Sequence, residues 1–257
     1  MKTPRIFLIF TAIGISALSC KKSVEPPQPE PAKGTLNFHL HTYLGIEEVD
    51  AYNIVYTMLD GRQVSLSLAE LYLSGIELIK ADGSIYPIND TIIFKTREIE
   101  TYVVAKVPPG NYKSVRFKVG LNPATNLKTP SSSASDVLNK PEMWFGATTQ
   151  PDGYVFLNLQ GKIDTSAAAN LSASQMTPFT YKIGTNANYK QVNMPDQTFA
   201  VLSNQTQFVH LIIDYYQLFN GVQLNNSTNI TITNSADNST TLATKIVNNI
   251  PSMFSYE

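Results

Sequence analysis

Cysteine, charge and histidine are all scarce in this sequence of 257 residues. A single cysteine is present, so no disulfide can form within the chain. Charged residues account for 15% of the sequence and the net charge is −1, whereas soluble domains usually carry roughly 25% charged residues. Because the charges are balanced and form no basic stripe, we do not expect a nucleic-acid-binding protein.

The short motifs of several large enzyme classes are also missing. The sequence has no P-loop, no dinucleotide-binding fingerprint, no H-E-x-x-H motif and no nucleophile elbow. We therefore expect a protein that is not an enzyme. A Ser-His-Asp hydrolase built around His210 is the weakest alternative, since it would need a serine and an acid within hydrogen-bonding reach.

Hydrophobic residues are plentiful, at 43%, and the sequence contains 13 Tyr and 12 Phe alongside many Thr, Val and Ile. This composition favours strands over helices. Apolar residues alternate with polar ones at Leu36, Phe38 and Leu40, and similar runs recur along the chain. We expect the longest strand at residues 208–216. The pattern predicts an all-β fold, an antiparallel, immunoglobulin-like β-sandwich with long loops.

Turn and cap signals support this prediction. Asp60-Gly61 and Asp82-Gly83 are typical of hairpin turns, and the Ser74-Gly75 pair indicates a β-bulge. Near the end of the chain, Ser239 or Thr240 is expected to cap one short helix that Pro251 would stop.

The N-terminus predicts export. Lys2 and Arg5 precede an apolar run over residues 6–18, which is the layout of a secretory signal and too short to span a membrane. The small residues before Cys20 resemble a bacterial lipobox. We expect a signal peptide at 1–19, a lipidated Cys20 with a proline-rich tether at 20–34, and a β domain at 35–257. The alternative is cleavage near Cys20 that leaves a free thiol.

Two of the three histidines form an H-x-H pair. His39 and His41 project from the same face of one strand, about 7 Å apart at Cβ, which suits chelation of one metal ion. The alternative is a pair of polar residues on a solvated strand face. His210, on the longest expected strand, is interpreted as a partly buried histidine with its hydrogen bonds satisfied.

Several segments together resemble one family, the MbnP family of copper-binding proteins named for methanobactin operons and common among lipoproteins of Bacteroidota. The resemblance covers roughly residues 36–254 and depends on the order and spacing of its motifs. The segments that carry it are Leu71-Tyr72-Leu73-Ser74-Gly75-Ile76-Glu77-Leu78 with Asp82-Gly83, then Gly110-Asn111-Tyr112, Phe117-Lys118-Val119-Gly120 with Asn126, Met143-Trp144, Gly153-Tyr154-Val155-Phe156 with Gly161, Phe179-Thr180-Tyr181-Lys182-Ile183-Gly184, Asp214 with Phe219-Asn220-Gly221, and Asn248-Asn249-Ile250 with Phe254.

The resemblance implies a β-rich extracytoplasmic domain with a copper site made of histidines and an oxidised tryptophan. It also implies a di-haem peroxidase-like partner that performs the oxidation. Here His39 or His41 occupies the first-strand histidine position, and Trp144 is the expected modified residue. Lys182 stands in place of the later histidine, and a protonated lysine offers copper no lone pair.

Two functions remain open from the sequence. The first is an outer-membrane lipoprotein of the cell envelope, anchored by its lipid, that binds copper through His39 and His41 in metal handling or uptake. The second is a metal-free surface module that binds a protein or glycan. Convergence of His39, His41 and Trp144 in the structure would favour the first, and their separation would favour the second.

Overall fold

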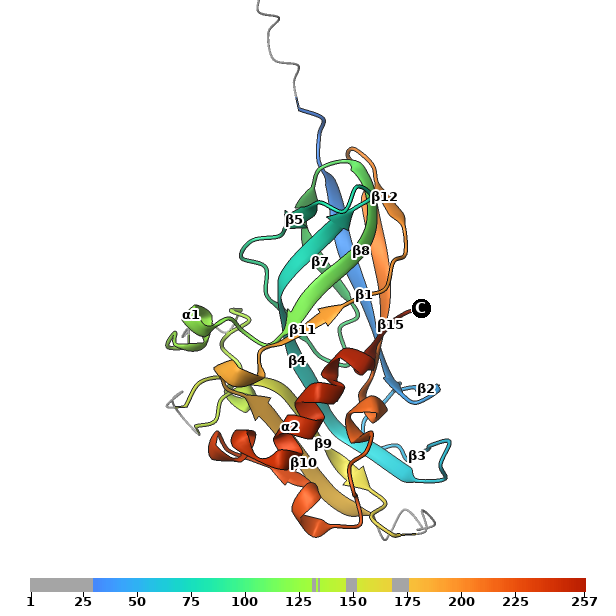
Figure 1. The fold of residues 1–257 in the computed structure, drawn as a ribbon, viewed down its shortest axis with the longest axis vertical. Helices are drawn as coiled ribbons and strands as arrows, with labels where there is room; N and C mark the ends of the chain where they lie inside the picture. The colour runs from blue at the N-terminus through green and yellow to red at the C-terminus, as the bar shows by residue number, and fades with distance from the viewer. Residues whose placement is uncertain (1–29, 131–132, 134, 147–151, 168–175) are drawn as a thin grey trace, which may run out of the picture. The chain divides into compact units, whose positions relative to one another are not determined.

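The computed structural model describes residues 30–130, 133, 135–146, 152–167 and 176–257 (Figure 1). The predicted signal peptide, Cys20 and most of the predicted tether lie outside these residues. The chain divides into two units, Met1–Glu30 and Pro31–Glu257, of which the second is described below. Within the described ranges, no helix has the length and apolar character needed to cross a bilayer.

Strands of the second unit form two sheets. The five-stranded sheet has the order β15-β13-β1-β2, with β7 also paired to β1. Its members are β1 (Gly34–Leu44), β2 (Glu47–Glu48), β7 (Thr101–Val107), β13 (Thr206–Asp214) and β15 (Phe254–Tyr256). The β1 strand is the central strand of this sheet, because β2, β7 and β13 all hydrogen-bond to it.

The ten-stranded sheet has the order β11-β8-β4-β9-β10-β14, with β3, β5 and β6 on β4 and β12 on β8. Its members are β3 (Tyr56–Thr57), β4 (Gln63–Lys80), β5 (Ile85–Pro87), β6 (Ile93–Lys95), β8 (Gly110–Val119), β9 (Val155–Ile163), β10 (Thr177–Gly184), β11 (Lys190–Asn193), β12 (Phe199–Val201) and β14 (Thr231–Ile232). The β7 and β8 strands are consecutive but belong to different sheets, so the Pro108-Pro109 turn carries the chain from one sheet to the other.

Among the residues that the structure describes, helical structure is confined to short segments. The α-helices are α1 (Pro123–Asn126) and α2 (Thr241–Asn249), and the 3₁₀ turns are η1 (Pro141–Met143), η3 (Asn186–Asn188), η4 (Tyr215–Phe219), η5 (Ser227–Asn229), η6 (Ala236–Ser239) and η7 (Ile250–Met253). The hydroxyl of Thr240 accepts a hydrogen bond from the Ala243 amide, which confirms the predicted cap of α2. Figure 1 shows α2 lying across β9 and β10.

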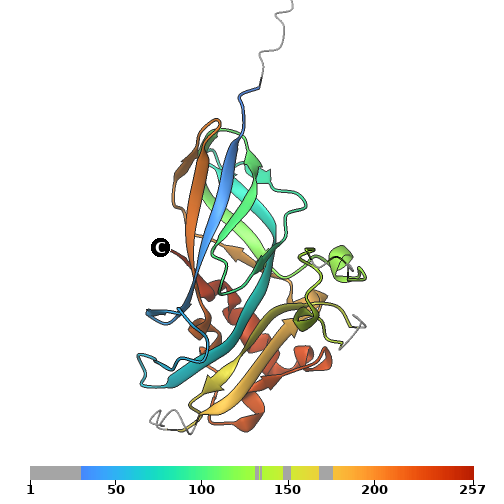
Figure 2. The same ribbon diagram turned by 180° about the vertical axis from the view of Figure 1, so that it is seen from behind.

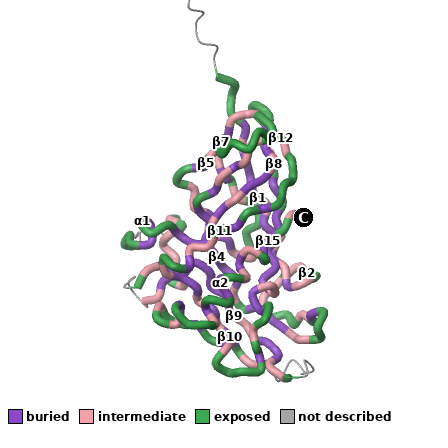
Figure 3. The backbone as a smooth tube through the Cα atoms, viewed as in Figure 1, coloured by how far each residue is buried: buried purple, intermediate pink, exposed green. Residues whose placement is uncertain are grey.

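The two sheets enclose one main apolar core. Phe38 of β1 and Phe117 of β8 meet across it with ring centroids 6.3 Å apart. Figure 3 shows that buried residues follow the strands of both sheets. The predicted all-β sandwich with one short C-terminal helix is confirmed. In detail the sheets are mixed, since β1 and β13 run parallel, as do β10 and β14.

The longest strand is β4, with 18 residues, and not the predicted 208–216 segment. Eleven of the 18 residues of β4 are buried, and residues 69–74 form an unbroken buried run because both faces of this central strand are covered there, so burial does not alternate along this stretch. The pairing register shifts between Ser74 and Glu77, where Gly75 has φ +56°, as the predicted bulge requires. The β13 strand ends at Asp214, whose carboxylate accepts a hydrogen bond from the Tyr216 amide and turns the chain into η4.

The outer face of the ten-stranded sheet carries a second apolar cluster. Tyr72 lies in this cluster, whereas its neighbours Leu71 and Leu73 belong to the main core, so Tyr72 points to the opposite side of β4. The segment after α1 covers Tyr72, because the Tyr72 hydroxyl donates to the Val137 carbonyl at 2.9 Å. The described residues around Val137 therefore cover part of this face.

Candidate metal centre

The parallel pairing of β1 with β13 brings all three histidines together. His39 is the direct partner of His210 in this register, and His41 follows two residues later on β1. Leu40 between them is fully buried in the main core, so the histidine side chains leave the opposite, outer face of the five-stranded sheet. Figures 1 and 2 both show β1 and β13 side by side.

The three rings are close enough to share one ion. Ring centroids of His39 and His41 lie 4.5 Å apart, those of His39 and His210 lie 5.0 Å apart, and those of His41 and His210 lie 6.5 Å apart. One nitrogen from each ring lies within 4.8 Å of the other two. Two nitrogens that are each about 2 Å from a metal ion can be at most about 4 Å apart, so a shift of under about 1 Å would close the site.

Oxygen atoms surround the histidine cluster and orient its rings. The Nδ1 atom of His41 lies 2.7 Å from a carboxylate oxygen of Glu48, and the Nδ1 atom of His39 lies 2.8 Å from the Thr101 hydroxyl. Nδ1–H donation to an oxygen leaves the Nε2 lone pair of the same ring free for a metal. Glu100 and Glu257 complete the surroundings, 3.6 Å from Nε2 of His39 and 3.1 Å from Nδ1 of His210.

Burial lowers the pKa of His39 below its ordinary value of 6.5, and the neighbouring His41 and His210 lower it further. Glu100 and Glu257 act in the opposite direction and raise it. The net decrease in pKa favours a neutral imidazole near neutral pH. Only the neutral ring can offer a nitrogen lone pair to a metal ion.

His210 is the member of this cluster that sequence reasoning missed. Its side chain is more exposed than expected, at 50%, and its Nδ1 atom has a polar partner, as expected, in the Glu257 carboxylate at 3.1 Å. Its polar partner among the described residues is the Glu257 carboxylate, together with the rings of His39 and His41, and not the serine that a hydrolase would need. An isolated histidine in a strand gave no signal of its partners, because those come from pairing with a distant strand.

Trp144 does not join the histidines. It packs in the second apolar cluster, 8% exposed, and forms an isolated bridge with Tyr154. The indole nitrogen donates to the Leu138 carbonyl at 3.4 Å. Trp144 therefore lies on the outer face of the ten-stranded sheet, whereas His39 and His41 lie on the outer face of the other sheet. This separation argues against a copper site built from His39, His41 and Trp144. By the criterion drawn from the sequence, it favours the metal-free alternative.

Lys182 lies on the same side as Trp144. Its neighbours Tyr181 and Ile183 face the main core, so its side chain leaves β10 on the outer face of the ten-stranded sheet. Lys182 pairs with Asn158 of β9, whose side-chain amide donates to the Glu142 carbonyl two residues before Trp144. Of the residues assigned by resemblance, Trp144 and Lys182 thus lie on the ten-stranded sheet, whereas His39 and His41 lie in the histidine cluster of the other sheet.

A family model supports the resemblance that the order of the motifs indicated. A comparison with curated proteins finds no match. Among solved structures, the fold is similar to MbnP from Methylosinus trichosporium, with 17% identity and a TM-score of 0.48 over 75% of this chain and 80% of that chain. The model of the MbnP family matches residues 33–242, which is most of the sequence. The chain belongs to the MbnP family.

Proposed function

We propose that this protein is an exported, lipid-anchored member of the MbnP family that binds copper in the cell envelope and catalyses no reaction. The observation that carries the proposal is the cluster of His39, His41 and His210, with one nitrogen from each ring within 4.8 Å of the others. The family is linked to copper, and imidazole nitrogen is a ligand that suits copper. Metal handling or uptake follows as the role of a copper protein held at the membrane surface.

The donor set fits a metal ion on structural grounds. Three imidazoles on one exposed face would repel one another if all were protonated, so the cluster suits neutral rings. Each ring also has an oxygen partner that orients it. His39, His41 and His210 would hold the ion, and Glu48 with Thr101 would orient two of the rings. The oxidation of Trp144 by a di-haem peroxidase-like partner stays a prediction of the family resemblance.

Copper binding is tested with the full chain purified in detergent. We expect one copper ion per chain to survive buffer exchange, measured by elemental analysis, because three converging nitrogen ligands make a tighter site than an H-x-H pair alone. Lys182→Ala serves as the control, since Lys182 lies on the other sheet and should leave the stoichiometry unchanged. Absence of copper in the wild-type protein at equimolar loading would contradict the proposed function.

Lipid anchoring is tested at the single cysteine. Cells grown with labelled fatty acid should incorporate the label into the wild-type protein and not into Cys20→Ser, because the thiol is the acylated group in a lipobox. The variant should also leave the membrane fraction. Equal labelling of both proteins would show that the anchor is elsewhere or absent.

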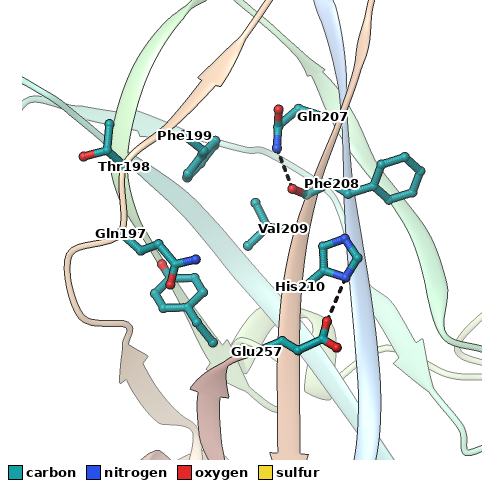
Figure 4. A pocket seen from close by; sticks show the side chains of 9 residues that line it. Gln197, Thr198, Phe199, Gln207, Phe208, Val209, His210 and Glu257 are labelled. Carbon is teal, nitrogen blue, oxygen red and sulfur yellow. Dashed lines mark hydrogen bonds and ion pairs between the residues drawn. The ribbon is translucent and has the colours of Figure 1, made fainter.

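A second candidate, a metal-free module that binds a protein or glycan, is favoured by a cavity beside the histidines. Figure 4 shows this cavity between Phe199 and the β13 residues Gln207 to His210. It has a volume of about 450 Å³, and Phe208 at its rim is 41% exposed. Aromatic and amide groups of this kind suit a peptide or sugar ligand. Binding of such a ligand by copper-free protein would support this function.

A further inference from the structure

Strand β13 has an open edge beside the cavity at Phe199. On one side β13 pairs with β1 along its whole length, whereas β15 on the other side covers only residues 211–213. Residues 206–209 therefore have no strand partner on the β15 side within the described part of the chain. The opposite wall is β12, which pairs with β8 alone. The cavity of about 450 Å³ thus lies between two strand edges, one from each sheet.

The backbone of Phe208 points into this opening. The Gln205 carbonyl accepts a hydrogen bond from β1, whereas the His210 carbonyl accepts one from the Glu257 amide on the β15 side. Backbone groups of successive strand residues point to alternate edges, so those of Phe208 and His210 point the same way. The Phe208 carbonyl instead accepts a hydrogen bond from Nε2 of Gln207 at 2.6 Å (Figure 4). A side-chain amide therefore takes the place of a missing strand.

Nothing in residues 206–210 blocks this edge in the usual way. Natural proteins protect a free strand edge with lysine, proline or a β-bulge, because unpaired backbone groups there can pair with another chain. Here the residues are Thr, Gln, Phe, Val and His, and their pairing with β1 continues without a register shift. The edge can therefore accept a further strand.

The two faces of the opening determine which side chains an incoming strand must carry. A strand added in line with β15 runs antiparallel to β13, and residues directly opposite each other share one face. Its residue opposite Phe208 therefore lies on the outer face, beside an exposed ring. The residues before and after it point inward, toward Val209 and Phe199 on the two walls of the cavity. These two inner positions suit apolar side chains.

The outer position suits a basic side chain. Glu257 lies opposite His210 on the outer face, and its carboxylate is half exposed. Alternate residues of one strand are roughly 7 Å apart, so a lysine or arginine opposite Phe208 would reach this carboxylate. Arginine would also stack on the Phe208 ring. The described residues that line the cavity include no lysine or arginine that would compete for Glu257.

We propose that the open edge of β13 binds an extended peptide by strand addition, and that the peptide carries a basic residue between two apolar residues. Main-chain hydrogen bonds supply affinity in this mode of binding, and the alternating side chains supply specificity. The inference rests on the second candidate function, whose ligand class it specifies, and does not depend on copper binding.

The probe is a fluorescently labelled synthetic peptide, acetyl-Thr-Val-Arg-Val-Thr amide, titrated into the copper-free full chain in detergent and followed by anisotropy. Replacing the arginine by glutamate tests the charge, and we expect binding at least tenfold weaker. Methylating the arginine amide removes the N–H that would donate to the Phe208 carbonyl, so binding should weaken at least about fivefold. Methylating the next amide, which points away from β13, is the matched control.

Variants of the protein test the same hydrogen bonds from the other side. Phe208→Pro and Phe208→Ala both lose the ring, but only proline also lacks the N–H, and proline is tolerated at a free edge. We expect Phe208→Pro to bind the peptide at least about fivefold more weakly than Phe208→Ala. Gln207→Ala frees the Phe208 carbonyl and should tighten binding, a gain that a poorly folded variant would not give.

Three results would overturn the inference: equal affinity for the arginine and glutamate peptides, equal effects of the two methylations, or unchanged or weaker binding by Gln207→Ala. Binding of the linear oligosaccharide maltohexaose without binding of the peptide would also overturn it, while the second candidate function would stand with a glycan as ligand. Binding of neither ligand would count against both and leave the proposed copper binding unaffected.

Discussion

Replacing His210 by alanine is expected to weaken copper binding at least about 100-fold, although His210 has no chelating partner near it in the sequence. Loss of a residue that merely orients a metal ligand typically costs 10–100-fold in affinity, and loss of a ligand should cost more. Without His210, the ion would keep the nitrogens of His39 and His41 on one strand. The variant should fold normally, because the side chain is half exposed. Isothermal titration with copper, or competition with a chelator, measures the effect.

Thr206→Ala is the matched control, since Thr206 lies on β13 two strand repeats before His210 and is exposed. We expect it to bind copper as the wild type does. The double variant His39→Ala with His41→Ala should lose copper retention altogether, because one imidazole is left. If His210→Ala kept wild-type affinity while the double variant lost it, copper would be bound by the H-x-H pair alone and the three-histidine centre would be wrong.

Replacing Phe117 by alanine is expected to reduce the free energy of unfolding by about 4 kcal/mol, the usual cost of emptying a large buried aromatic site. Phe117 is fully buried and contacts Phe38 of β1 on one side and Phe254 of β15 on the other. It therefore joins the two sheets and supports the strand that carries Glu257. A loss of this size should lower Tm by roughly 10 °C for a domain of this length, measured by thermal unfolding followed by circular dichroism.

Phe208→Ala is the control for this prediction. Phe208 is also a phenylalanine in a strand, but its side chain is 41% exposed, so truncation leaves no closed cavity. We expect it to cost under about 1 kcal/mol. Similar Tm values for the two variants would mean that contact through Phe117 does not hold the sheets together.

The local alternation of apolar and polar residues was sufficient to predict most strands of the fold. The alternation at Leu36, Phe38 and Leu40 predicted which face of β1 is buried, and the opposite face is where His39 and His41 emerge. The cap of α2 at Thr240 and the bulge at Gly75 were also predictable, because both depend on residues adjacent in the chain. The length of strand β4 was underestimated, because burial on both of its faces leaves no alternation to detect.

The sequence by itself determined the all-β class, the family and the pairing of His39 with His41 on one face, since strand periodicity is a local property. The tertiary structure alone decided that β13 runs parallel to β1 in the register that sets His210 beside His39. It also decided that Trp144 lies on the other sheet. Strand neighbours and register depend on how the whole chain buries its apolar faces, and a shift of one residue would have turned His210 inward.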